Sequence, residues 1–172
     1  YPTCDMAALT WLADPDELLV AENRHGEAGI RFTLLDPLTG TVRWSGVVIA
    51  DGGTVTSWLP AGDGDLVYGI HNHRATIFAW SRQQRRIVRQ LPELGLGDLC
   101  YNMLVNGPDG RLWGLSNTCV FAVDRELTKA ESLASYGDYA SRNFYRFGLT
   151  FGPDGHLYFP NGTHLMRLRV NG

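Results

Sequence analysis

The sequence is poor in charge, and its basic residues form no large cluster. Charged residues make up 19% of the 172 positions and the net charge is −3, whereas globular chains carry roughly 25% charged residues. Nucleic-acid binding needs a basic surface, so the composition argues against a nucleic-acid partner. The one basic run comprises Arg82, Arg85, Arg86 and Arg89. We interpret it as a solvated turn and strand edge rather than a partner site, because Lys and Arg protect exposed edges.

Cysteine is also scarce, and the three residues Cys4, Cys100 and Cys119 cannot all pair internally. None lies in a Cys-x-x-Cys motif, so each is expected to be a small buried hydrophobe, with a Cys4–Cys100 disulfide as the alternative. No apolar run approaches the length of a transmembrane helix, so no membrane partner is expected. The sequence also lacks a Walker loop, a nucleophile elbow and a dinucleotide fingerprint, and no cofactor is expected.

Hydrophobic residues show no sustained helical period, and glycine or proline interrupts the chain about every ten residues. Glycine is abundant, with 20 residues, and Trp, Tyr and Phe contribute 5, 7 and 7. Glycine-rich turns between aromatic and β-branched runs are typical of all-β proteins. A hydrophobic content of 44% is enough for one domain with a sizeable core.

A short turn followed by a leucine recurs at a nearly constant interval. The leucines are Leu18, Leu66, Leu112 and Leu157, at intervals of 48, 46 and 45 residues. The clearest copies read Gly-Pro-Asp-Gly-x-Leu-(Trp/Tyr), at 107–113 and 152–158. A period of this length indicates a repeat architecture and favours the blades of a β-propeller.

Aligned on the leucine, the chain divides into four units, at about 7–50, 54–95, 100–135 and 146–172. Each unit is expected to form antiparallel strands joined by tight turns, within a single domain spanning 1–172. The expected first strands are 8–12, 55–59, 101–105 and 147–151, and the second are 18–21, 66–70, 112–115 and 157–159. The third are 30–35, 76–80, 119–123 and 164–168, and the outer ones are 41–49, 86–91 and about 129–134.

The fourth unit lacks its outer strand, which leaves two arrangements open. Residues 1–6 could supply that strand and close a four-bladed ring, or the chain could be part of a larger propeller. An incomplete ring would expose a flat sheet face, and self-association is then expected.

The turns at 107–113 and 152–158 resemble those of SMP-30/gluconolactonase, virginiamycin B lyase-like and two-component sensor propellers. The segment Asp36-Pro37-x-Thr39-Gly40-x-Val42 is similar to the hairpin of YVTN and quinoprotein-type repeats. This resemblance spans all four units and implies the fold. It assigns no catalytic residue, because the repeated turns are structural.

Polar residues recur in the loops between second and third strands, which a propeller would gather at one end of its channel. Each loop holds an asparagine: Asn23, Asn72, Asn117 and Asn161. Asparagine tolerates left-handed turn geometry, which is the structural interpretation. The functional interpretation is a ligand-binding ring with His25, His71 and His73, joined by Tyr139 and Arg142 from the connection before the fourth unit.

These residues favour a non-catalytic binding or sensor propeller that recognises a small polar ligand, such as a carbohydrate, or a protein loop. The alternative is a metal-assisted lyase or hydrolase acting on a sugar or lactone. Its weak candidate ligands are His71 and His73 with His25 or His164, and Glu27 or Tyr139 would act as acid or base. A third hypothesis is a fragment of a larger propeller enzyme. His-x-His places two imidazoles on one side of a strand but is a weak metal signal by itself.

Overall fold

The computed structural model describes residues 4–24, 27–71, 76–91, 99–116, 118–135, 148–161 and 164–170. Throughout these ranges the regular elements are β-strands, which confirms the prediction of an all-β chain. They include no helix long and apolar enough to cross a membrane. The strands form four antiparallel sheets, three of four strands and one of three.

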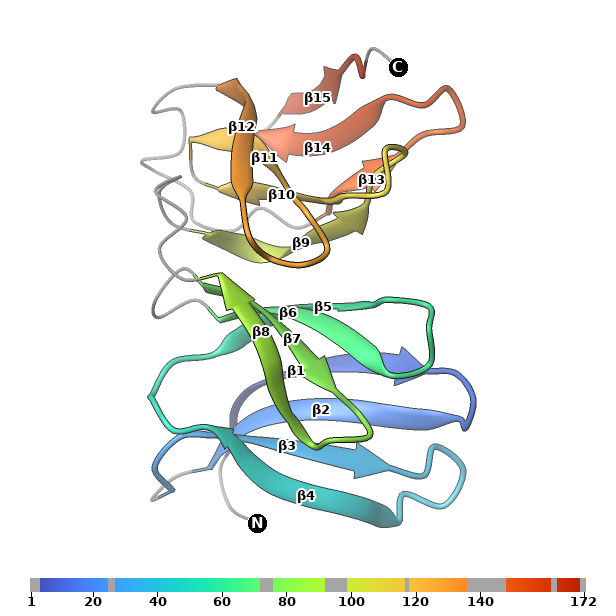
Figure 1. Cartoon of the computed structure of the whole chain (residues 1–172), viewed down its shortest axis with the longest axis vertical. Coiled ribbons are helices and arrows are strands. Elements are labelled where there is room, and N and C mark those ends of the chain that lie inside the picture. Colours follow the sequence, from blue (N-terminus) through green and yellow to red (C-terminus); the bar gives the residue numbers. More distant parts are fainter. Residues whose placement is uncertain are drawn as a thin grey trace. The chain divides into compact units, whose positions relative to one another are not determined.

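The sheets follow one another along the chain, and strands adjacent in sequence are adjacent in each sheet (Figure 1). Sheet 1 contains β1 (Cys4–Leu12), β2 (Glu17–Arg24), β3 (Ile30–Leu35) and β4 (Val42–Ile49). Sheet 2 contains β5 (Val55–Pro60), β6 (Leu66–His71), β7 (Thr76–Ser81) and β8 (Arg86–Leu91). Sheet 3 contains β9 (Leu99–Asn106), β10 (Leu112–Ser116), β11 (Cys119–Val123) and β12 (Ala130–Ser135). Sheet 4 contains β13 (Thr150–Phe151), β14 (Leu157–Asn161) and β15 (His164–Leu168).

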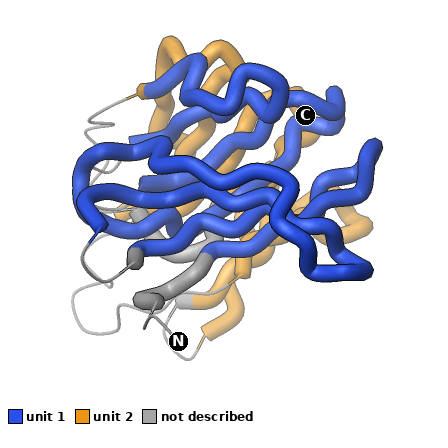
Figure 2. Tube along the Cα trace, turned by 90° about the horizontal axis from the view of Figure 1, so that it is seen from below, with its two compact units in different colours: residues 1–90 blue, residues 91–172 orange. Residues whose placement is uncertain are grey.

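The chain forms two compact units, residues 1–90 and residues 91–172 (Figure 2). Sheets 1 and 2 lie in the first unit, apart from the last residue of β8, and sheets 3 and 4 lie in the second. The strand positions expected from the repeat are found within a few residues in all four sheets. Residues 4–6, which could have completed sheet 4, belong instead to β1, where Cys4 and Asp5 pair with Arg24 and Asn23 of β2.

Each unit has its own hydrophobic core between its two sheets. In the first unit, Phe32 and Leu34 of β3 pack with Phe78 and Trp80 of β7. In the second, Trp113 and Leu115 of β10 pack with Leu157 and Phe159 of β14. Every residue of β7, β10 and β11 is buried, as in strands that are covered on both faces.

The repeated turn is built by its glycines, its aspartate and its aromatic residue together. Trp113 Nε1 donates to Asp109 Oδ1 at 2.9 Å, and the Tyr158 hydroxyl donates to Asp154 Oδ2 at 2.8 Å. A Cβ on Gly107 would lie 2.2 Å from the Trp113 ring, so only glycine fits beneath it. Gly110, with a φ of +80°, supplies the left-handed residue of the same turn. The motif is therefore explained by hairpin geometry.

Candidate functional site

Two predicted site residues lie at the same end of sheets 1 and 2. Both contact the segment that connects the two sheets. Asn23, near the end of β2, donates from Nδ2 to the carbonyl of Gly53. His71, at the end of β6, is 4% exposed and lies with Nε2 3.0 Å from the carbonyl oxygen of Gly52. Gly52 and Gly53 belong to the segment between β4 and β5. Asn23 and His71 therefore hold the connection between the two sheets.

The contact between His71 Nε2 and the carbonyl of Gly52 argues against this nitrogen as a metal ligand. A carbonyl oxygen only accepts hydrogen bonds, so Nε2 carries the proton and is not available as a metal ligand. Glu27, the suggested acid or base, accepts from Arg31 Nε at 2.9 Å. His164 is exposed at the start of β15. The described residues contain no group of three or more His, Cys, Asp or Glu that could hold a metal ion.

The amide of Asn23 has one unused acceptor. Its Oδ1 is buried and has no hydrogen-bond partner among the residues that the structure describes. A buried acceptor without a partner costs free energy, and such atoms often mark a place for water or ligand.

The other predicted site positions cannot be placed. His25, Asn72, His73, Asn117, Tyr139 and Arg142 lie outside the described residues, and Asn161 is described only as the last residue of β14. The side chains of Cys4 and Cys100 also lie outside them. Cys119 is a buried free thiol, as expected.

A buried ion pair joins sheets 1 and 2 at their opposite end, where the hairpin turns lie. Arg82, which follows β7, has a side chain only 7% exposed, and Glu17, which begins β2, is 6% exposed. Arg82 Nε donates to Glu17 Oε2 at 2.8 Å, and Nη2 lies 2.7 Å from the same oxygen. The interpretation of Arg82 as part of a solvated edge is therefore wrong, although Arg86 of that run is exposed.

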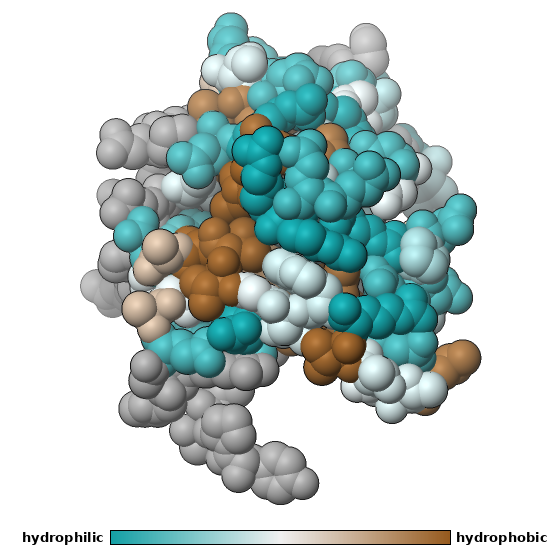
Figure 3. All heavy atoms as spheres, turned by 60° about the horizontal axis from the view of Figure 1, so that its bottom comes forward, coloured by the Kyte–Doolittle hydropathy of each residue, from teal (hydrophilic) through white to brown (hydrophobic). Residues whose placement is uncertain are grey.

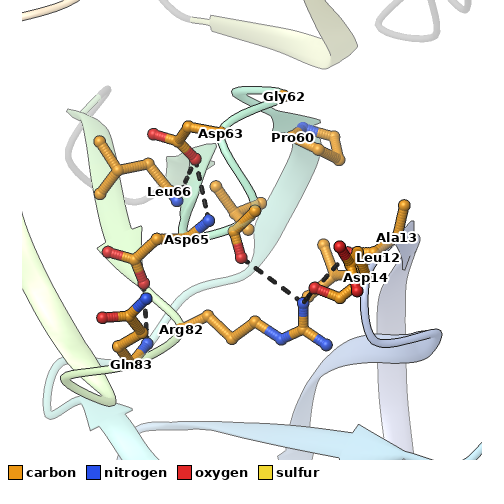
Figure 4. Close-up of a pocket in the computed structure, with 12 residues that line it drawn as sticks. Leu12, Ala13, Asp14, Pro60, Gly62, Asp63, Asp65, Leu66, Arg82 and Gln83 are labelled. Carbon is orange, nitrogen blue, oxygen red and sulfur yellow. Dashed lines mark hydrogen bonds between the residues drawn. The ribbon is translucent and has the colours of Figure 1, made fainter.

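Arg82 also binds the turn between β1 and β2. Nη1 donates to the carbonyls of Ala13 and Asp14 at 3.2 and 3.1 Å, and Nη2 donates to the carbonyl of Pro15. The guanidinium has five N–H donors, and these contacts with Glu17 employ all of them. Figure 4 shows Arg82 reaching across a cavity of about 420 Å³ toward Ala13 and Asp14. Its charge is already compensated within the protein.

The aspartates near this end of the sheets are engaged in turns. Asp63 Oδ1 accepts from the backbone amides of Asp65 and Leu66 at 2.9 and 2.8 Å. Asp65 accepts from the Ser81 hydroxyl at 2.9 Å. The amide of Thr39 and then the guanidinium of Arg43 lower the pKa of Asp36 well below its usual range. The carboxylates of Asp36, Asp63 and Asp65 are therefore already engaged as hydrogen-bond acceptors within the protein.

A second cavity, of about 400 Å³, lies in the second unit between sheets 3 and 4. Arg111, Trp113 and Arg169 line it together with apolar side chains. Arg111 Nε lies 2.7 Å from Asp109 Oδ2, and its Nη1 lies 2.8 Å from Glu131 Oε2. Arg169 makes no hydrogen bond or ion pair with the described part of the chain. This cavity could not be predicted from the sequence, because Arg111 and Arg169 are 58 residues apart.

Comparison with known proteins supports the fold and leaves the chemistry open. No protein-family model matches the chain, and no curated protein sequence matches it. Among solved structures, it is similar to Kuenenia stuttgartiensis hydrazine synthase, with a TM-score of 0.61 and 15% identity. The match covers 88% of this chain and 40% of the hydrazine synthase chain. Similarity at this identity shows a shared β-rich fold alone.

Proposed function

We propose that this chain is a β-propeller module that binds its ligand without transforming it. Four consecutive antiparallel sheets with one repeated strand order support the propeller architecture. The first strands of sheets 1 and 2, β1 and β5, pack against each other, as innermost strands of neighbouring blades do. The expected ligand is a small polar molecule, such as a carbohydrate, or a protein loop at the end where second and third strands are joined.

The observation that carries this proposal is the buried, unpartnered Oδ1 of Asn23. It lies at the loop end of sheet 1, where His71 and the segment of Gly52 and Gly53 also lie. A ligand hydroxyl could donate to this oxygen without disturbing the bond from Nδ2 to Gly53. In the repeat, Asn72, Asn117 and Asn161 are the positions that correspond to Asn23 in the other three sheets.

The test is a titration of isotope-labelled protein with a panel of monosaccharides, following the side-chain amide of Asn23 by NMR. We expect at least one sugar to shift this resonance, and Asn23→Ala to weaken its binding about twofold to tenfold, as loss of one neutral hydrogen bond does. Asn106→Ala is the matched control, since Asn106 is exposed and bonds Arg125 at the hairpin-turn end. The site would be contradicted by an equal loss of sugar affinity in both variants. It would also be contradicted if no sugar shifted the Asn23 resonance at about 10 mM.

A second candidate role, a segment of a larger or assembled propeller, is favoured by the outer face of sheet 1. Strand register places Leu9, Trp11, Val42 and Val47 on one face, where they are 60%, 50%, 55% and 47% exposed. Viewed from the side of β3 and β4, apolar surface gathers there beside polar surface (Figure 3). Contiguous exposed apolar patches mark interaction sites, so we propose that this face packs against another sheet.

This role predicts self-association of the chain through sheet 1. Light scattering coupled to size exclusion, at tens of micromolar protein, should give about twice the chain mass of 19.1 kDa. The double variant Leu9→Lys/Trp11→Lys should return the mass to that of one chain, because burying two new charges opposes association. Gln83→Lys adds a charge on an exposed turn and should leave the mass unchanged. A wild-type monomer at every concentration would rule out self-association.

A further inference from the structure

Both cavities are lined by the residue that follows the third strand of the second sheet in the unit, Arg82 in the first unit and Arg169 in the second. In sheet 1, Glu17 precedes the repeated Leu18, and in sheet 3 the same position is Arg111 before Leu112. Arg82 follows Ser81, the register partner of Leu66, and Arg169 follows Leu168, the register partner of Leu157. Arg82 and Arg169 are therefore equivalent residues of sheets 2 and 4.

The charges at these equivalent positions differ. In the first unit the pair is Arg82 with Glu17, which are in direct contact. In the second unit the pair is Arg169 with Arg111, and both line one cavity. At the position of Glu17, the second unit therefore carries an arginine instead of a carboxylate.

The arginines of the second cavity also retain free donors. Arg82 uses all five N–H groups, whereas Arg111 contacts Asp109 through Nε and Glu131 through Nη1. Asp109 and Glu131 balance the charge of Arg111, so Arg169 contributes the uncompensated positive charge. Guanidinium groups bind carboxylates in a planar, often bidentate geometry.

Apart from Asp109, whose carboxylate is already bonded to Arg111 and Trp113, the remaining lining is apolar. Trp113, Leu133, Leu168 and Val170 contribute to the wall of the cavity, and its volume of about 400 Å³ lies within the roughly 300–1,000 Å³ of small-molecule sites. From the free arginine donors and this lining we propose that the cavity binds a small monocarboxylate with an apolar body. The carboxylate lies between Arg111 and Arg169, as that of Glu17 lies against Arg82, and the apolar body contacts the side chains around Trp113.

The test uses benzoate as the probe, with benzamide as its uncharged analogue and inorganic sulfate as an anion without an apolar body. Backbone amides of residues 168–170 are followed by NMR in labelled full-length chain. We expect benzoate to saturate these shifts with a Kd on the order of 1 mM, and benzamide and sulfate to bind at least tenfold more weakly. Arg169→Gln should weaken benzoate binding about tenfold or more, as loss of a charge-assisted contact does.

The matched control is Arg167→Gln, which removes the same charge two residues earlier, within β15. Arg167 pairs with Tyr158 and not with the core-facing residues, so benzoate binding should be unchanged in this variant. Equal binding of benzoate and benzamide, equal binding of benzoate and sulfate, or undiminished binding by Arg169→Gln would each overturn the proposal. The Asn23 site lies in the other unit, so this outcome and that of the sugar titration are independent.

Discussion

Replacing Glu17 with alanine is expected to lower the free energy of unfolding by about 3–5 kcal/mol, because removal of one partner leaves a buried charge uncompensated. Arg82 is held between sheets 1 and 2, and its side chain is only 7% exposed. Its guanidinium is also bonded to the carbonyls of Ala13, Asp14 and Pro15, which hold it in this position. Since small domains are stable by about 5–15 kcal/mol, the loss would be a large part of the total.

The measurement is urea unfolding followed by tryptophan fluorescence. Four of the five tryptophans, Trp11, Trp44, Trp58 and Trp80, belong to residues 1–90, so this signal reports mainly on the unit that contains the ion pair. Asp16→Ala is the control, because the neighbouring Asp16 is exposed, and surface changes usually alter stability by less than about 0.5 kcal/mol. A similar small effect of Glu17→Ala would show that the pair contributes nothing to holding the sheets.

A double-mutant cycle separates the ion pair from the other contacts of Arg82. Arg82→Ala alone removes the bonds to Glu17 and to three carbonyls, so it should be at least as destabilising as Glu17→Ala. If Glu17 and Arg82 are coupled, the double variant should lose less unfolding free energy than the sum of the two single variants. The difference, which is the interaction energy, should be about 0.5–3 kcal/mol. Additive losses would mean that Arg82 acts through the turn carbonyls alone.

The fold could be predicted largely from local signals. The repeated leucine, the turn glycines and the buried apolar runs fix strand order within each sheet, since short antiparallel hairpins depend on residues near in sequence. The segment 124–135 forms a turn and then β12, as its place in the repeat predicts. Of the two arrangements left open, the one in which residues 1–6 complete the fourth sheet is not seen for residues 4–6, which belong to β1. Ring closure depends on distant strands, whereas pairing with β2 is local.

The contacts of the candidate site could not be predicted in the same way. The asparagine interval predicts that Asn23 lies in the loop after the second strand, whereas the structure places it within β2. Its bond to Gly53 depends on how the connection between sheets is folded. Likewise, Glu17 and Arg82 are 65 residues apart, and an arginine beside a turn is ordinarily solvated. Only the packing of sheet 1 on sheet 2 turns that residue into a buried one.

Replacing Phe32 with alanine is the second change with a large expected effect, about 3–5 kcal/mol of lost stability. Phe32 is fully buried, and its ring centroid lies 5.0 Å from that of Trp58 and 5.7 Å from that of Trp80. It thus joins sheet 1 to two aromatic residues of sheet 2, and its removal would leave a cavity that these rings can fill only by leaving their edge-to-face positions.

Urea unfolding by fluorescence, together with two further variants, tests this explanation. Leu38→Ala removes an aliphatic side chain that is 94% exposed and should cost less than about 0.5 kcal/mol. Phe32→Leu keeps most of the apolar volume but loses the aromatic contacts, which contribute about 0.5–1.5 kcal/mol per pair beyond burial. An intermediate loss for Phe32→Leu would show that both burial and ring geometry hold the sheets together. A loss for Phe32→Ala no greater than that for Leu38→Ala would contradict the packing of the two sheets on this core, and with it the buried environment inferred for Arg82.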